Sequence, residues 1–221
     1  MENWINTHIT LPVHRQTLSE EKENSLSHLA GLVFYFFTFF HIITRPELEG
    51  HPGSKTGMII FSLSNIMLFL CSSMYHGLPD STMKKVFRIF DHSSIYILIA
   101  GSYTPILMFA GTPLLRAYTT GIWAAAFIGI FLTIRFWGKL YVLHVVLYAV
   151  MGWSIVTIWG SVFPCLPDGI MPFIVAGGVI YTVGIVFYSI RQIPHNHFIW
   201  HIFVLAGSLL YYYTYTAFLL A

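Results

Sequence analysis

Five polar residues lie in or beside long apolar stretches of this sequence, at Ser72, His76, Asp91, His197 and His201. Ser72 and His76 are four residues apart, as are His197 and His201, so each pair lies on one face of a helix. Three imidazoles and a carboxylate suffice for a zinc site that keeps one coordination position open. Ionisable groups in a membrane span are costly to bury, which favours a functional role for them.

The chemistry that such a site supports is hydrolysis, because bound zinc activates water. We expect His76, His197 and His201 to bind Zn²⁺. Asp91 would either bind the metal directly or hold the water and act as general base. Ser72 would hydrogen-bond a substrate carbonyl or Asp91. Since the surroundings are apolar, a lipid amide or ester is the expected substrate.

Each of these residues also has a purely structural interpretation. A histidine at a helix end is often interfacial, Asp91 could complement a helix dipole, and Ser72 could bond to its own helix. His92 points about 100° away from Asp91 around a helix and is left out. His144 is the reserve ligand. The remaining histidines considered are assigned to the interfaces (His8, His14, His51 and His195) or excluded by depth (His41).

The composition identifies the class of protein that must position these residues. Of 221 residues, 56% are hydrophobic and 9% are charged, whereas soluble domains carry about 25% charged residues. This composition indicates a membrane protein whose chain crosses the bilayer several times. The net charge of +2 gives no sign of a nucleic-acid partner, and the first 27 residues lack the apolar region of a cleaved signal peptide.

A helix needs about 20 apolar residues to cross a bilayer core of about 30 Å. Seven segments meet this requirement: 27–44, 56–77, 90–110, 117–135, 140–161, 170–190 and 196–219. The loops between them are short, so neighbouring helices must be antiparallel. The prediction is an all-α integral membrane protein. Residues 1–26 form a cytoplasmic N-terminal segment, and residues 27–221 form a single seven-helix domain.

The distribution of Lys and Arg predicts the orientation, because cytoplasmic loops carry an excess of them. Eight of the eleven fall in the N-terminal segment and the second, fourth and sixth loops. The other three are Arg45, Lys55 and Arg116 on the opposite side. The N-terminus is therefore expected in the cytoplasm and the C-terminus outside. This orientation brings all five polar residues to the cytoplasmic side of the membrane.

Three patterns resemble the hemolysin III family, the bacterial branch of the progestin and adiponectin receptor family. The first is Glu20-x-x-x-Asn24-x-x-x-His28. The second is Ser72-x-x-x-His76 with Asp91-His92-x-x-x-Tyr96 and Gly101-x-Tyr103-Thr104-Pro105, and the third is His197-x-x-x-His201. They occur in the family's order and span residues 20 to 201.

The resemblance implies a seven-helix fold with a cytoplasmic N-terminus and zinc bound by His76, His197 and His201. It also implies that Asp91 acts through water, with Ser72 nearby. Glu20, Asn24 and His28 would form a polar second layer or a cap for the first helix. The family is similar in its metal arrangement to membrane ceramidases, which favours hydrolase chemistry.

Two functions compete at this point. The first is a zinc-dependent hydrolase of lipid amides or esters, acting in lipid homeostasis at the inner (plasma) membrane. The second is a non-enzymatic, receptor-like or homeostasis protein with a structural zinc. A cytolysin is a distant third, since seven obligate spans do not leave their membrane. The expected partners are membrane lipids, the lipid substrate or a free fatty acid in the bundle.

Overall fold

The computed structural model describes residues 16–46, 51 and 53–220, together with residues 5, 7 and 9. Within this part of the chain every regular element is a helix, and seven are long and apolar enough to cross a membrane. The seven-helix prediction is confirmed. The spans are α2 (Leu18–Ile43), α3 (Ser54–Gly77), α4 (Thr82–Ala110), α5 (Pro113–Arg135), a broken fifth span within 141–165, α8 (Met171–Ser189) and α9 (Asn196–Leu219).

Two helices begin about two turns earlier than the apolar runs predict, because polar caps extend them beyond the hydrophobic stretch. Helix α2 starts at Leu18, where Thr17 and Glu20 form a reciprocal capping box. Helix α4 starts at Thr82, where the Ser81 hydroxyl accepts a hydrogen bond from the Lys84 amide. Each extension adds about two turns that carry charged side chains.

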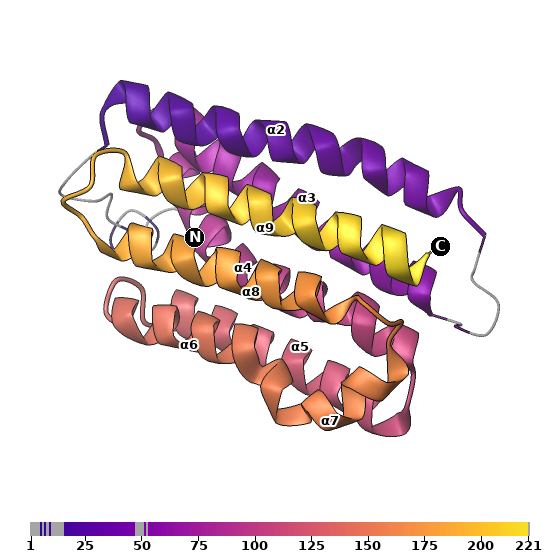
Figure 1. Ribbon diagram of the computed structural model, residues 1–221. Helices are drawn as coiled ribbons and strands as arrows, with labels where there is room; N and C mark the ends of the chain where they lie inside the picture. The colour runs from indigo at the N-terminus through magenta and orange to yellow at the C-terminus, as the bar shows by residue number, and fades with distance from the viewer. Residues whose placement is uncertain are drawn as a thin grey trace.

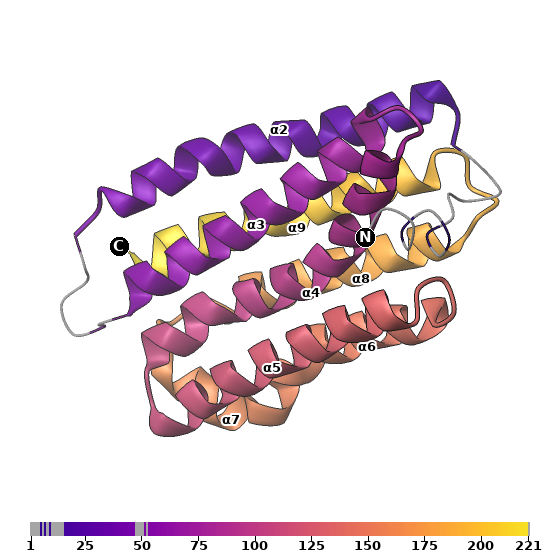
Figure 2. The ribbon, with the colours of Figure 1, turned by 180° about the vertical axis from the view of Figure 1, so that it is seen from behind.

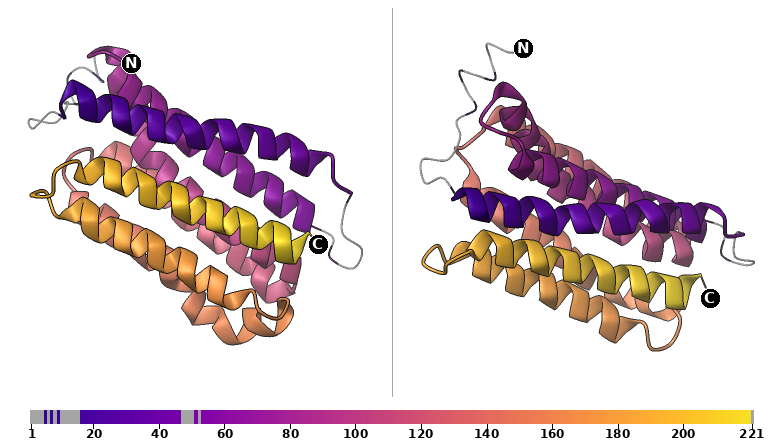
Figure 3. Two further views of the ribbon diagram at one scale, coloured as in Figure 1. Left: turned by 45° about the horizontal axis from the view of Figure 1, so that its top comes forward. Right: turned by 90° about the horizontal axis from the view of Figure 1, so that it is seen from above.

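The helices form one antiparallel bundle, with their axes nearly aligned (Figure 1). Helix α2 lies beside both α3 and α9, and α8 lies beside α9. Seen from behind, α4 runs between α3 and α5 (Figure 2). Viewed from above, the length of α2 runs alongside α9 (Figure 3). Helix α4 contacts α3, α5, α6 and α9, and so lies at the centre of the bundle.

Helices α3 and α4 pack closely, backbone against backbone. A Cβ at Gly57 would stand only 2.8 Å from the Pro105 Cα, so the two backbones approach too closely for any side chain. Around this pair the largest fully buried side chains are aromatic, including Tyr35, Phe61 and Tyr215. The tyrosine hydroxyls are paired, since Tyr35 and Tyr215 each donate to a backbone carbonyl at 2.7 Å.

The fifth span is not the regular helix predicted for residues 140–161. Helix α6 (Tyr141–Trp153) gives way to a 3₁₀ segment (Ser154–Ile158), the short helix α7 (Trp159–Val162) and a second 3₁₀ turn (Phe163–Cys165). The Tyr103 hydroxyl lies 2.8 Å from the Gly152 carbonyl oxygen and accepts a hydrogen bond from the Ile155 amide at 2.9 Å. A backbone break inside a membrane needs such partners, because lipid supplies none.

Successive helices run in opposite directions through the bundle, as the short loops predict. The last turn of α3 and the first turns of α2, α4 and α9 lie at one end, and the last turn of α9 lies at the other. The start of α2 and the end of α9 are therefore at opposite ends, as seven spans require. Which end faces the cytoplasm stays a prediction from the charge distribution.

Candidate metal centre

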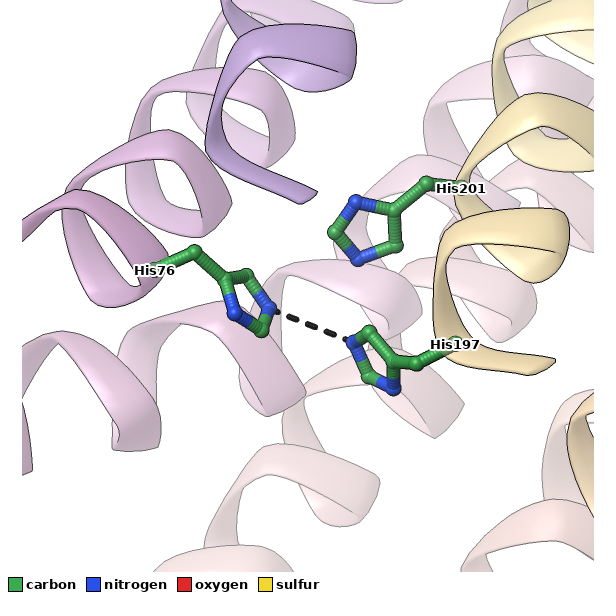
Figure 4. A group of neighbouring side chains, drawn as sticks. All are labelled: His76, His197 and His201. Carbon is green, nitrogen blue, oxygen red and sulfur yellow. Dashed lines mark hydrogen bonds between the residues drawn. The ribbon is translucent and has the colours of Figure 1, made fainter. Parts of the chain in front are cut away.

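Three histidines converge at the end of the bundle where α3 ends and α9 begins (Figure 4). His76 comes from the last turn of α3, and His197 and His201 come from the first two turns of α9. One ring nitrogen from each lies within 4.8 Å of the others. His76 and His201 are buried, and His197 is partly buried. The three predicted ligand positions are thus brought together, and they could hold a metal ion.

The shortest contact in this group joins the Nε2 atoms of His76 and His197, which are 3.2 Å apart. Two nitrogens at this distance share either a proton or a cation. Zinc–nitrogen bonds of about 2.0–2.1 Å at a tetrahedral angle place two ligand nitrogens about 3.3 Å apart. The observed spacing fits both a shared proton and two ligands of one metal ion.

The other ring nitrogens are turned outward to oxygen atoms. His76 Nδ1 lies 2.8 Å from Glu21 Oε2, and His201 Nδ1 lies 3.1 Å from the Asn24 carbonyl oxygen. These oxygens accept hydrogen bonds, so each Nδ1 carries its proton and donates it. In the neutral ring, Nε2 is then left with a free lone pair, as a metal ligand requires.

Glu21 is the contributor to the site that sequence reasoning missed. Its carboxylate bonds His76 with one oxygen and lies 3.2 Å from the Lys84 ammonium with the other. The sequence pattern singled out Glu20 instead, and Glu20 caps the start of α2. The signal available was helical spacing, since Glu21, Asn24 and His28 fall at i, i+3 and i+7 on one face.

A cavity of about 220 Å³ extends from His197 and His201 into the bundle. Asp91, Ser72, His197 and His201 all lie on its wall. Its far part is lined by Tyr211, about 20 Å further along α9 than His197 at about 1.5 Å per residue. Most of the remaining wall is apolar. Metal-ligand candidates, a carboxylate and a hydroxyl thus share one apolar cavity.

Asp91 stands apart from the ligand atoms. The group within 4.8 Å contains three imidazole nitrogens and, among the described residues, no carboxylate. Asp91 Oδ2 lies 3.5 Å from His92 Nδ1, whose shorter contact is with the Arg88 carbonyl oxygen at 2.9 Å. Asp91 is thus not part of the group of ligand atoms, and its action through water stays a prediction. Ser72 is fully buried, and its hydroxyl has no partner among the described residues.

The reserve ligand His144, and those described histidines that the sequence assigned to the interfaces or excluded by depth, are not part of the cluster. His144 lines the same cavity, but its Nδ1 is paired with the Tyr96 hydroxyl at 2.7 Å, and it is not in the ligand group. His195 pairs with Glu23 at 2.7 Å, and His51 stacks on Phe109. His41 is at the end of α2 remote from the cluster. His8 and His14 lie outside the described residues.

The fold and this cluster define a multi-pass membrane protein with a candidate metal centre between its helices. Residues 16–212 match the family described as Haemolysin-III related, and the chain belongs to this family. It is 32% identical to Hemolysin-3 of Bacillus cereus over 87% of this chain and 89% of that one. It is 33% identical to the Hemolysin-3 homolog of Bacillus subtilis (strain 168), over 87% and 91% of the two chains.

A more distant similarity extends to animals. The chain is 30% identical to the monocyte to macrophage differentiation factor of Homo sapiens, over 70% of this chain and 66% of that protein. This relative fits the wider progestin and adiponectin receptor family, which the sequence patterns predicted. The family assignment made from the sequence is therefore confirmed.

Proposed function

We propose that this protein is a zinc-dependent hydrolase of lipid amides or esters, acting in the lipid homeostasis of its own membrane. The observation that carries the proposal is one cavity wall that combines histidines, a carboxylate and a hydroxyl. The ligand nitrogens of His76, His197 and His201 lie within 4.8 Å of one another, and Asp91 and Ser72 face the same apolar cavity as two of them. A lipid chain in that cavity would bring its polar end to the histidines.

The donor set favours zinc over harder cations. Imidazole suits zinc, whereas Mg²⁺ and Ca²⁺ prefer oxygen ligands. Three protein ligands leave a position free, as in catalytic zinc sites, whereas structural sites fill all four. A zinc ion bound by the three histidines would supply a Lewis acid and activate water for attack on a carbonyl.

Asp91 and Ser72 would then take part in the hydrolysis in two different roles. The Asp91 carboxylate accepts a proton from the water that attacks the carbonyl carbon. A new C–O bond forms, the amide C–N or ester C–O bond breaks, and the proton passes to the leaving amine or alkoxide. The Ser72 hydroxyl donates a hydrogen bond to the substrate carbonyl oxygen, which gains negative charge as the reaction proceeds.

The non-enzymatic alternative, with a structural zinc, makes a different demand on Asp91. A structural site does not need an unligated carboxylate on a cavity wall next to it, and burying one is costly. The position of Asp91 outside the ligand group therefore supports the hydrolase. The predicted orientation would place the site near the cytoplasmic face of the plasma membrane.

The proposal is tested by supplying purified protein with a long-chain lipid amide and measuring the fatty acid released. Zinc-loaded protein is expected to release it, a chelator is expected to stop the release, and added zinc to restore it. Release that is unchanged after the metal has been stripped would contradict a zinc-dependent mechanism. No release from any long-chain amide or ester would favour the structural alternative.

Zinc affinity is expected to depend on Glu21, because its carboxylate fixes the His76 ring with Nε2 toward the cluster. Glu21→Gln should weaken zinc binding about 10–100-fold, the usual cost of losing an outer partner of a metal ligand. The measurement is competition with a chelator of known affinity.

Glu23→Gln is the matched control for this variant. Glu23 is on the same helix and bonds a histidine at 2.7 Å, but that histidine, His195, is not in the cluster. Its zinc affinity should equal that of the wild type. Equal zinc affinities in Glu21→Gln and Glu23→Gln would show that Glu21 does not support zinc binding.

A further inference from the structure

His28 is a buried histidine that the proposed reaction does not use. It lies on α2, is only 3% exposed, and neither of its ring nitrogens has a hydrogen-bond partner among the described residues. Leaving a buried polar group unpaired costs free energy, so such groups in native proteins call for an explanation. His28 lines the same cavity as the candidate metal centre.

The orientation of its ring is fixed by two neighbours. One face stacks on His201, with ring centroids 3.6 Å apart and planes 7° apart, and Phe69 packs edge-on with centroids 5.0 Å apart. In a parallel stack the nitrogens point outward in the plane of the ring, not at the neighbouring ring. His28 is accordingly absent from the group of ligand atoms that could hold a metal.

A second unpartnered group lies on the same wall. Ser72 is one turn beyond Phe69 on α3, is 0% exposed, and its hydroxyl has no hydrogen-bond partner among the described residues. His28 and Ser72 both line a cavity whose other walls are largely apolar, including Leu68 and Leu98. Ser72 is one turn deeper than His76, and His28 stacks on the deeper histidine of α9.

We propose that His28 and Ser72 form a polar subsite that binds a hydroxyl or amide N–H group of a long-chain amphiphile, about one turn deeper than His76. A neutral imidazole offers one donor and one acceptor, and a serine hydroxyl offers one donor and two lone pairs, so Ser72 can accept from this group even while it donates to a substrate carbonyl. A ligand group that both donates and accepts satisfies this pair, whereas an ether oxygen accepts only. The inference rests on the proposed function only in taking a long-chain lipid as the ligand of the cavity.

The test compares the binding of two probes, 1-hexadecanol and its methyl ether. Neither probe can be hydrolysed, so the test of the subsite remains valid even if the protein proves not to be a hydrolase. Binding is followed by the fluorescence of Trp137, Trp153 and Trp200, which line the cavity. The wild type should bind the alcohol about tenfold more tightly than the ether, the scale of one or two net hydrogen bonds. His28→Phe keeps a ring for the stack and should bind both probes about equally.

His51→Phe is the matched control. His51 stacks on Phe109 with the same 7° angle and a centroid distance of 3.8 Å, but it does not line the cavity. It should keep the preference for the alcohol. His28→Phe should also keep its zinc and lose no thermal stability, because an unpaired buried polar group is replaced by an apolar one of similar shape.

Ser72→Ala and His28→Gln keep the proposal testable if His28→Phe does not fold. Ser72→Ala should reduce the preference for the alcohol a few-fold, and His28→Gln should retain part of it, since an amide also donates and accepts. Equal preference in wild type, His28→Phe and Ser72→Ala, or no preference in the wild type, would overturn the subsite. If the wild type shows no preference for the alcohol, the hydrogen-bond partner of His28 is water and not the ligand.

Discussion

Asp91→Asn is expected to lower the rate of lipid amide hydrolysis by roughly 10²-fold or more, the scale of lost general-base catalysis. Asparagine keeps the shape of the side chain and loses its ability to accept a proton. Because Asp91 lies outside the group of ligand nitrogens, zinc content should remain close to that of the wild type. The measurements are turnover of a long-chain amide and elemental analysis on the same sample.

Two further variants make this result specific. Ser72→Ala should cost less than Asp91→Asn, because a hydroxyl contributes one hydrogen bond and no proton transfer. Asp168→Asn, at an exposed position in a loop at the other end of the bundle, should be fully active. Two results together would identify the zinc as structural. Asp91→Asn would still fulfil the cellular role of the protein completely, and no purified zinc-loaded protein would hydrolyse a lipid.

Removing a histidine of α9 is expected to have the other large effect. His197→Ala or His201→Ala removes a direct ligand of the metal. Losing an outer partner of a ligand weakens metal binding about 10–100-fold, so the zinc affinity of these variants should fall by more than that. A ligand that binds only the folded state stabilises it, by about 2.7 kcal/mol at 100 times its dissociation constant. The zinc-dependent rise in melting temperature should therefore disappear in both variants.

His195→Asn controls for damage to the start of α9. His195 precedes that helix with a φ of +55°, a conformation that asparagine tolerates, and it pairs with Glu23 outside the cluster. Its melting temperature should still rise with zinc. Loss of the zinc effect in this variant as well would mean that the helix terminus, and not the imidazole ligands, is responsible.

The sequence predicted the spans and the histidine cluster because both leave local signals. Apolar runs of about 20 residues set the number of helices, and the two i, i+4 pairs together with the charge distribution placed His76, His197 and His201 at one end of the bundle. The family patterns pointed to the same residues. Nothing in these signals depended on how the helices rotate against one another.

The parts that the sequence did not predict depend on that rotation and on packing. Glu21 and Glu20 are adjacent, and only the angle of α2 against α3 decides which carboxylate reaches His76. The break in the fifth span is stabilised by the hydroxyl of Tyr103 from another helix, which leaves no signal in residues 140–161 themselves. The early start of α2 reflects a cap in polar sequence, which a search for apolar runs passes over.

Zinc content measured by elemental analysis of the purified wild type, His197→Ala and His201→Ala tests the central claim most directly. Three ligand nitrogens within 4.8 Å of one another predict one zinc ion per chain in the wild type and almost none in either variant. Unchanged zinc content in both variants would contradict the assignment of these histidines as metal ligands, and with it the proposed reaction.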